Sequence, residues 1–228
     1  MRILVFAPHP DDDIFCCGGS TVKLLRQGHE VATVYLTSGD GGSIKHSRET
    51  IAKIREQEAR DASAVLGVSD LTFLRHPEGD IRHTRQSLED IIGLIRSKKP
   101  HTIYLPHSHD GHFDHKQTHT LVMDGINRAG GPWFKECGQQ PWAVQTVLAY
   151  ESWAPLQEVG HTEDISDFMD TKLEALDMHS SQTQDIRYGD AARGLNRYRA
   201  VMFAKGEFCE CFQVIRISTI SEPESQGN

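Results

Sequence analysis

Short apolar runs and longer amphipathic segments alternate along most of the chain, and this alternation constrains the fold more than any other feature. The apolar runs are continuous, which is typical of parallel strands covered on both faces. The expected strands are residues 2–7, 31–36, 71–74, 102–106 and 145–150, and the expected helices are residues 18–27, 47–66, 88–98 and 115–128. This order predicts an α/β domain with a mostly parallel, doubly wound sheet and helices on both faces.

The length of the chain, 228 residues, fits one domain of this kind. We expect the domain to span residues 1–220 and to include a further helix at 169–179 and a late strand at 208–217. Residues 221–228 are expected to form a flexible tail. Two stretches are interpreted as loop insertions, residues 129–142 and 153–163. Either insertion could act as a lid, and we expect the determinants of substrate specificity to lie in them.

Charge and hydropathy exclude several functional classes. The chain carries 24 basic and 32 acidic residues, a net charge of −8, which argues against bulk binding of nucleic acid and favours a small or neutral substrate. No apolar run approaches the length needed to cross a bilayer, so we expect no integral membrane segment and a cytoplasmic protein. Five irregularly spaced cysteines, including the adjacent Cys16 and Cys17, indicate reduced thiols. The sequence leaves a homo-oligomer open.

Histidines are concentrated in one short region. Six of the 13 histidines lie within residues 101–119, and four of these fall in the loop after the fourth expected strand, residues 107–115. The loop after the first expected strand reads His9-Pro10-Asp11-Asp12-Asp13, where a dinucleotide-binding protein would carry its glycine-rich motif. Both loops follow the carboxyl ends of parallel strands, so they can converge at one edge of the sheet.

The first of these loops needs a cation. Three successive carboxylates beside a histidine repel one another, and their burial is costly unless a positive charge neutralises them. A catalytic zinc ion takes three ligands from His, Asp or Glu side chains and leaves one position for water, and His9, Asp12 and His115 would supply this set. Two histidines and one carboxylate also suit ferrous iron, so the sequence leaves the choice between Zn²⁺ and Fe²⁺ open.

The two motifs together resemble a known family. Pro8-His9-Pro10-Asp11-Asp12 after the first strand and His112-Phe113-Asp114-His115 after the fourth are similar to motifs of the PIG-L/LmbE-like family of zinc-dependent de-N-acetylases. Further similarity lies in residues 36–42, 54–59, 66–68 and 172–182, so the resemblance covers most of the chain. It implies a single Rossmann-like domain that removes the acetyl group from glucosamine-type sugars, which are attached to inositol, malate, lipid or another glycoside.

The resemblance also implies a role for each site residue. The implied metal ligands are again His9, Asp12 and His115. Asp11 is implied to be the general base that activates the metal-bound water. His112 would stabilise the oxyanion and protonate the leaving amine, while Asp114 would orient His112 and keep its pKa high enough for it to stay charged near neutral pH. Arg55 would bind the substrate through sugar hydroxyls or a linked anion.

This chain departs from the family pattern at one position. Asp13 stands where the family has a glutamate, and its carboxylate is one methylene shorter. We expect Asp13 to serve as a structural group or to support the metal ligands. His107, His109 and His119 match no position of the pattern and have no assigned role.

Simpler interpretations stay open for several of these residues. The acidic turn at residues 9–13 could cap a helix, the histidine loop could be a solvated surface loop, and Arg55 could pair with Glu56 or Glu58. The glycine run at residues 39–42 fits a tight turn better than a phosphate cradle. The three tryptophans could line a sugar site or bury apolar area. They are Trp133, Trp142 and Trp153.

Two other functions also stay open at this point. A metal-dependent amidase would use the same metal ligands on a conjugate that carries a different acyl group. A non-catalytic module would bind a sugar or a nucleotide without turnover. The intact catalytic positions favour a deacetylase over such a module.

Overall fold

The structure is a computed structural model that describes residues 1–138 and 140–218. Its strands are β1 (Arg2–Ala7), β2 (Glu30–Thr37), β3 (Asp70–His76), β4 (Thr102–Pro106), β5 (Thr146–Tyr150), β6 (His161–Asp164) and β7 (Cys209–Ile217). Its α-helices are α1 (Asp12–Arg26), α2 (Arg48–Leu66), α3 (Arg85–Lys98), α4 (Phe113–Ala129), α5 (Met169–Asp177), the short α6 (Ser180–Thr183) and α7 (Tyr188–Phe203). The expected tail at residues 221–228 lies outside the described residues, as does the end of the expected domain at 219–220.

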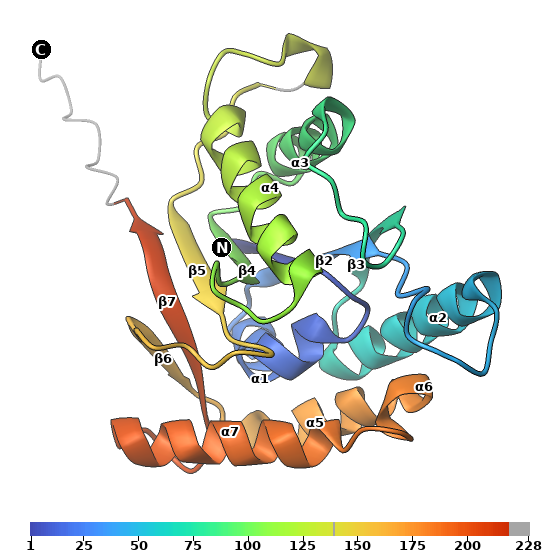
Figure 1. The fold of residues 1–228 in the computed structure, drawn as a ribbon. Helices are drawn as coiled ribbons and strands as arrows, with labels where there is room; N and C mark the ends of the chain where they lie inside the picture. Colours follow the sequence, from blue (N-terminus) through green and yellow to red (C-terminus); the bar gives the residue numbers. More distant parts are fainter. Residues whose placement is uncertain (139, 219–228) are drawn as a thin grey trace, which may run out of the picture.

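The strands form one sheet in the order β3-β2-β1-β4-β5-β7-β6 (Figure 1). The five strands from β3 to β5 are parallel, and β7 pairs antiparallel with both β5 and β6. The prediction of an α/β domain with a mostly parallel sheet is therefore confirmed. The antiparallel pair lies at one edge, outside the region where β1 and β4 meet.

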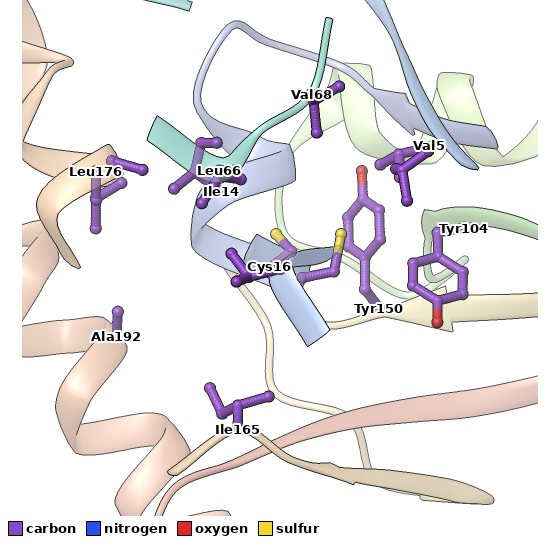
Figure 2. Close-up of a cluster of buried hydrophobic side chains, with 14 of the residues drawn as sticks. Val5, Ile14, Cys16, Leu66, Val68, Tyr104, Tyr150, Ile165, Leu176 and Ala192 are labelled. Atoms are coloured by element: carbon purple, nitrogen blue, oxygen red, sulfur yellow. The ribbon is translucent and has the colours of Figure 1, made fainter. Parts of the chain in front are cut away.

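Apolar side chains of β1 alternate between two cores on opposite faces of the sheet. Ile3 and Val5 belong to a core that also contains side chains of α1, α2, α5 and α7, part of which is drawn in Figure 2. Leu4 and Phe6 belong to the other core, which contains side chains of α3 and α4. Full burial of one such side chain stabilises the fold by about 1.5–3 kcal/mol. Helices therefore cover both faces of the sheet, as the continuous apolar runs predict.

Short polar signals set the ends of the helices. The Ser47 hydroxyl accepts a hydrogen bond from the Thr50 amide and starts α2, while Thr84 and Ser87 form a capping box at the start of α3. Gly67 ends α2 in the left-handed conformation, with φ of 89°. These signals agree with the helix boundaries expected from the sequence to within a few residues.

Three parts of the fold differ from the expectations. α1 begins at Asp12 instead of near residue 18 and continues through non-helical backbone angles at Cys17. β6 overlaps the expected insertion at residues 153–163, and α7 is absent from the elements expected from the sequence. α7 contains Gly189 and Gly194, and glycine disfavours a helix, so the sequence gives only a mixed signal for a helix here.

The described residues of the stretch 129–142 lie at the amino-terminal end of the strands, far from the histidine loops. The stretch follows the carboxyl end of α4, a 17-residue helix about 25 Å long that carries His115 in its first turn. The buried Arg96 guanidinium donates hydrogen bonds to four backbone carbonyl groups in this stretch. The Trp142 indole N–H donates to the carbonyl of Pro100. The expectation that this stretch forms a lid or determines specificity is therefore wrong.

The structure also bears on the expectations about membrane segments and cysteines. Within the described ranges, no helix is both long enough and apolar enough to cross a membrane. All five cysteines lie in these ranges as free thiols, and only Cys137 is not fully buried. Burial raises the pKa of the Cys16 and Cys17 thiols, so these two side chains act as small apolar groups of the core.

Candidate metal centre and active site

The loops after β1 and β4 converge at the carboxyl edge of the sheet. β1 and β4 are neighbouring parallel strands, with Ile3 opposite Thr102, so the two loops start side by side. His9 lies in the first loop, Asp12 in the first turn of α1 and His115 in the first turn of α4. The structure thus shows the convergence that the order of strands and helices predicts.

Three donor atoms from these elements lie close together. Asp12 Oδ2 is 3.1 Å from His9 Nδ1 and 3.2 Å from His115 Nε2. Ligand atoms about 2.1 Å from a tetrahedral ion stand about 3.4 Å apart, so these separations are close to those of a zinc site. Both ring nitrogens of His115 are buried, and neither has a hydrogen-bond partner among the described residues; of the two, Nε2 faces Asp12. An orphaned buried nitrogen beside a carboxylate fits a divalent metal ion at this point.

His112 belongs to the same cluster. Candidate ligand atoms of His9, His112 and His115 lie within 4.8 Å of one another. His9 and His115 are buried, whereas His112 is partly exposed. His112 Nδ1 accepts a hydrogen bond from the amide of Asp114 at 3.2 Å, so we assign the ring hydrogen of the neutral side chain to Nε2.

Two buried carboxylates contact the far nitrogen atoms of the other two histidines. Asp114 Oδ2 lies 3.1 Å from His9 Nε2 and accepts the amide hydrogen of Gly79 at 2.7 Å. Asp110 Oδ1 lies 3.4 Å from His115 Nδ1. A carboxylate in this position fixes the tautomer and the direction of a metal-binding imidazole. The arrangement leaves His9 Nδ1 and His115 Nε2 to face the metal position.

The same carboxylates set the charge of the two rings. Burial opposes a positive charge on His9, but its contacts with Asp114 and Asp12 outweigh burial and raise its pKa to about 9. Burial likewise opposes a charge on His115, and the nearby carboxylates of Asp12 and Asp110 raise its pKa to about 10. Negative charge that favours a proton on each ring also favours a metal ion in its place, so metal binding would release protons.

The expected pairing of the Asp114 carboxylate with His112 is wrong. The carboxylate points to His9 and to the amide of Gly79 in the loop after β3, and only the Asp114 amide contacts His112. Burial and positive charge on His9 and His115 lower the pKa of His112. This lowered pKa opposes the positive charge that the resemblance implies for the His112 imidazole.

Arg55 lies on α2, and its guanidinium holds the Asp11 carboxylate at the site. Its side chain is 3% exposed; Nη2 donates to Asp11 Oδ2 at 2.9 Å, and Nη1 lies 3.4 Å from Glu78 Oε2. Neither Glu56 nor Glu58 is its partner, because Glu56 pairs with other arginines and Glu58 accepts hydrogen bonds from serines of α6. The alternative of a surface ion pair is thus excluded.

The glycine run at residues 39–42 makes room for the Arg55 guanidinium. A Cβ atom on Gly39 would lie 2.7 Å from Arg55 Cζ, and one on Gly42 would lie 2.6 Å from Arg55 Nη1. Gly39 also has a φ of 62°, which side chains disfavour. The run is therefore a tight turn, as preferred from the sequence, and it encloses an arginine side chain.

A cavity of about 310 Å³ opens beside the metal donors. Its polar wall contains His9, Asp11, Asp12, Arg55, Glu78, His112 and Gln182, and its apolar wall contains Phe15, Trp153, Leu176, Ile186 and Tyr188. This volume is at the lower end of the range for small-molecule sites. Of the three tryptophans, Trp153 lines the cavity, whereas Trp133 and Trp142 belong to the stretch at the other end of α4.

Asp13 and the unassigned histidines lie outside this cavity. Asp13 accepts a hydrogen bond from the Tyr35 hydroxyl at 2.8 Å, and burial raises its pKa to about 7. His107, His109 and His119 contact nearby backbone or serine oxygen atoms at 2.8–2.9 Å. These contacts connect loops and strands near the site. None of the four side chains, Asp13 and the three histidines, lines the cavity.

The structure brings the predicted site residues together, namely His9, Asp11, Asp12, Arg55, His112, Asp114 and His115. Two further residues of the site were not singled out from the sequence. Asp110 lies in the histidine loop, and its position two residues before His112 is a signal that could have found it. Glu78 follows β3 and reaches the cavity only through the fold.

Comparison with known proteins agrees with this geometry. The sequence profile of the PIG-L family, described as GlcNAc-PI de-N-acetylase, matches residues 4–126. The chain belongs to the PIG-L family. Diacetylchitobiose deacetylase of Thermococcus kodakarensis is 30% identical over 190 residues, 79% of this chain and 70% of that protein. The probable N-acetyl-α-D-glucosaminyl L-malate deacetylase 2 of Bacillus cereus is 29% identical over 211 residues, 88% of this chain and 92% of that protein.

The fold of this PIG-L member also occurs in an enzyme with a different reaction. The structure of GalB, the 4-carboxy-2-hydroxymuconate hydratase of Pseudomonas putida KT2440, matches with a TM-score of 0.86 and 19% identity. The match covers 97% of this chain and 98% of GalB. Because this likeness shows the fold alone, the reaction has to be argued from the site residues.

Proposed function

We propose that the protein is a metal-dependent hydrolase that removes the acetyl group from an N-acetylated amino sugar of the N-acetylglucosamine type. The observation that carries the proposal is the Asp11 carboxylate on the cavity wall beside the donor atoms of His9, Asp12 and His115. The family membership and the two curated relatives, both named as deacetylases, support it.

The metal ligands that we propose are His9, Asp12 and His115. Zn²⁺ is the first choice and Fe²⁺ the alternative, because two imidazoles and one carboxylate suit both ions. When bound, such an ion supplies Lewis-acid chemistry, since it polarises a carbonyl group and lowers the pKa of water.

Asp11 is placed to accept a proton from the attacking water. The contact of its Oδ2 with Arg55 Nη2 fixes the carboxylate on the cavity wall, and Arg55 is fixed in turn by Glu78 and the carbonyl of Gly39. We propose that Asp11 passes this proton to the amide nitrogen, which leaves as an amine. Water adds to the acetyl carbon, the C–N bond breaks, and acetate and the free amino sugar are released.

His112 is placed to donate a hydrogen bond to the acetyl oxygen. Its Nδ1 is occupied by the Asp114 amide, which leaves Nε2–H as the donor on a ring that lines the cavity. A neutral ring with a lowered pKa acts as a hydrogen-bond donor to developing negative charge, and such a donor contributes about 10²–10³-fold to the rate. This role replaces the charged acid suggested by the resemblance.

We further propose that residues 1–220 form one Rossmann-like domain that acts on a small N-acetylated sugar. The parallel strand order β3-β2-β1-β4-β5 supports the first part, because the dinucleotide-binding fold has the same order over these strands. The size of the cavity supports the second.

Asp11→Asn tests the proposed role of the base. We expect the variant to bind about one equivalent of metal, as the parent does, and to release acetate about 10²–10⁴-fold more slowly from an N-acetylglucosamine glycoside. Asp61→Asn, an exposed position on α2, is the matched control and should retain the parental rate. Acetate release at the parental rate by Asp11→Asn would refute the assignment.

The same assay separates the two other functions left open by the sequence. A series of glucosamine glycosides with acetyl and larger acyl groups should be cleaved fastest at the acetyl group. Faster release of a larger acyl group would favour the amidase, and tight glycan binding without any product would favour the binding module.

A further inference from the structure

The cavity beside the metal donors offers no free positive side chain to a substrate anion. Among the described residues, Arg55 is the only lysine or arginine that lines it. The guanidinium is buried and already contacts Asp11, Glu78 and the carbonyl of Gly39. An anionic group of a ligand would have to displace one of these acceptors to reach it.

Negative charges outnumber positive charges at the site. Five carboxylates lie in the cavity wall or directly behind the histidines, namely Asp11, Asp12, Glu78, Asp110 and Asp114. Against them stands the positive charge of Arg55, and a divalent ion at the proposed ligands would add two more. The site therefore repels an anionic group of a ligand, even with the metal bound.

Positive side chains in the segments that frame the cavity are paired as well. The pairs are Lys45 with Asp185, Arg48 with Asp40, and Arg187 with Asp190. Asp185 and Arg187 flank Ile186, which lines the cavity, and Asp40 belongs to the turn that encloses Arg55. The entrance thus adds no unpaired cation from these segments that would attract an anion.

An exposed aromatic ring borders the cavity next to the proposed oxyanion donor. Trp153 is 57% exposed, and its ring centre lies 6.4 Å from that of His112 with an interplanar angle of 28°. The electron-rich face of an indole attracts polarised C–H groups, such as those on the apolar face of a sugar ring. When the acetamido group lies at His112, the group attached to the sugar can pass over Trp153.

We propose that the site selects N-acetylglucosamine glycosides in which the attached group is an uncharged ring that stacks on Trp153, and that it disfavours attached groups with a carboxylate or a phosphate. This inference rests on the proposed function and narrows its substrate class. Of the two curated relatives, one is named for an uncharged disaccharide and the other for a malate conjugate. The charges of this cavity favour the uncharged class.

A matched set of three substrates tests the proposal on the metal-loaded protein. They are the 4-carbamoylbenzyl, 4-carboxybenzyl and methyl glycosides of N-acetylglucosamine with the same anomeric configuration. The first two differ only in charge, and we expect the carbamoyl compound to have a kcat/KM about tenfold higher at low salt. Raising the salt to about 0.5 M should narrow this difference, because it screens the repulsion.

Trp153→Ala tests the stacking surface. We expect a loss of about tenfold in kcat/KM for the carbamoylbenzyl glycoside and a change within about twofold for the methyl glycoside. Trp133→Ala is the matched control, because Trp133 is also exposed but lies at the far end of α4. This control should leave both values unchanged.

Glu78→Gln tests the charge. We expect the ratio of kcat/KM for the carboxy compound to that for the carbamoyl compound to rise about threefold or more, because one negative charge is removed from the wall. Glu78→Gln could also lower activity in general, because Glu78 contacts Arg55. Such a loss would affect both substrates equally and would cancel in the ratio. Glu136→Gln, which also removes a carboxylate paired with an arginine but far from the cavity, should leave the ratio unchanged.

The outcomes separate this proposal from the proposed function. Equal or faster cleavage of the carboxy compound at low salt would overturn the selectivity while leaving the deacetylase intact. An equal loss for the methyl and carbamoylbenzyl glycosides in Trp153→Ala would overturn the stacking surface. Acetate release from none of the three compounds would overturn the proposed function and this inference with it.

Discussion

The three histidines of this site differ in the atoms that their ring nitrogens face, and this difference suggests different roles. His9 and His115 each have one nitrogen toward Asp12 and the other toward a second carboxylate, whereas His112 has one nitrogen on a backbone amide. The first two rings are thus oriented for the metal-ligand role that we propose, and the third for the proposed N–H donor role toward the cavity.

Removal of the charge on Asp114 should weaken metal binding. In Asp114→Asn the ring of His9 loses its carboxylate partner, and we expect the metal affinity to fall about 10–100-fold. Asp124→Asn, on the exposed side of the same helix, is the control and should bind metal as the parent does. Competition with a metal-binding dye measures both, and an unchanged affinity in Asp114→Asn would contradict the orienting role.

The sequence is informative about site residues where the motif is local. His9, Asp11 and Asp12 lie in one loop, and their density of charge alone indicates a cation. The Asp114 carboxylate contacts His9, which is 105 positions away in the sequence. His112 is only two positions from Asp114, and this short separation suggested the wrong partner. Arg55 shows the same limit, since its partner Asp11 lies 44 positions away.

Two of the proposed metal ligands lie in the first turns of helices. Asp12 begins α1, and His115 lies in the first turn of α4, so both ligands have backbone positions fixed by regular hydrogen bonds. Carboxylates in a first turn are also favoured by the positive end of the helix dipole. The position of α4 against α3 therefore affects the site directly.

The contact between α3 and α4 depends on a glycine. A Cβ atom on Gly125 of α4 would collide with Ile91 of α3, whereas one on Gly93 of α3 would meet nothing within 4 Å. We expect Gly125→Ala to lower the free energy of unfolding by about 1–3 kcal/mol despite the better helix propensity of alanine. Gly93→Ala should raise it by up to about 1 kcal/mol.

Thermal unfolding measures this pair, with a change in Tm of about 2–4 °C for each kcal/mol in a chain of this size. A Tm for Gly125→Ala at or above that of Gly93→Ala would contradict the close contact of the two helices.

An ion pair between β6 and α1 should contribute stability that depends on pH. The hydrogen bond from His161 lowers the pKa of Glu163 to about 2, and the Lys23 ammonium at 2.7 Å adds to the effect against burial. Because the folded pKa is below the ordinary value, this stability is present above about pH 4.5 and is lost as the pH falls toward 2.

Glu163→Gln should remove this dependence. Between pH 6 and about pH 3 we expect the free energy of unfolding to fall less in the variant than in the parent, by on the order of 1–2 kcal/mol. Urea unfolding at both pH values measures the difference, with the exposed Glu174→Gln as the control. An equal fall in parent and Glu163→Gln would show that the pair contributes nothing.

The strands of the parallel sheet were predicted correctly, whereas β6 and α7 were missed. The strands of the parallel sheet are continuous apolar runs, and their order follows from the alternation with helices. β6 has only four residues and α7 contains two glycines, so both lack a clear local signal, and both pack against β7. The position of residues 129–142 depends on the direction of α4. The sequence of that stretch alone does not reveal this direction.

At the scale of the whole molecule, the order of the strands explains the location of the site. From β1 the chain adds β2 and β3 on one side of the sheet and then β4 and β5 on the other, so the order in which strands are added reverses between the parallel strands β1 and β4 (Figure 1). Ligands of open α/β sheets bind at the carboxyl ends of the strands where this reversal occurs. This reversal explains why the loops after β1 and β4 carry the proposed metal ligands and the proposed base.

The sequence predicts the general location but not the surroundings of the cavity. The apolar wall comes from α1, the loop after β5, α5 and the segment around Tyr188, which only the complete fold brings together. Of the two expected insertions, the one at residues 153–163 reaches the cavity through Trp153, and we propose that it contributes to specificity.

The most direct test of the account is acetate release by chelator-treated protein as metal is added. Without metal, we expect no acetate release from an N-acetylglucosamine glycoside. The rate of release should rise in proportion to added Zn²⁺ or Fe²⁺ and reach its maximum at about one equivalent. His115→Ala should show no such rise. Full activity in the metal-free protein, or no release with either ion bound, would contradict a metal-dependent deacetylase.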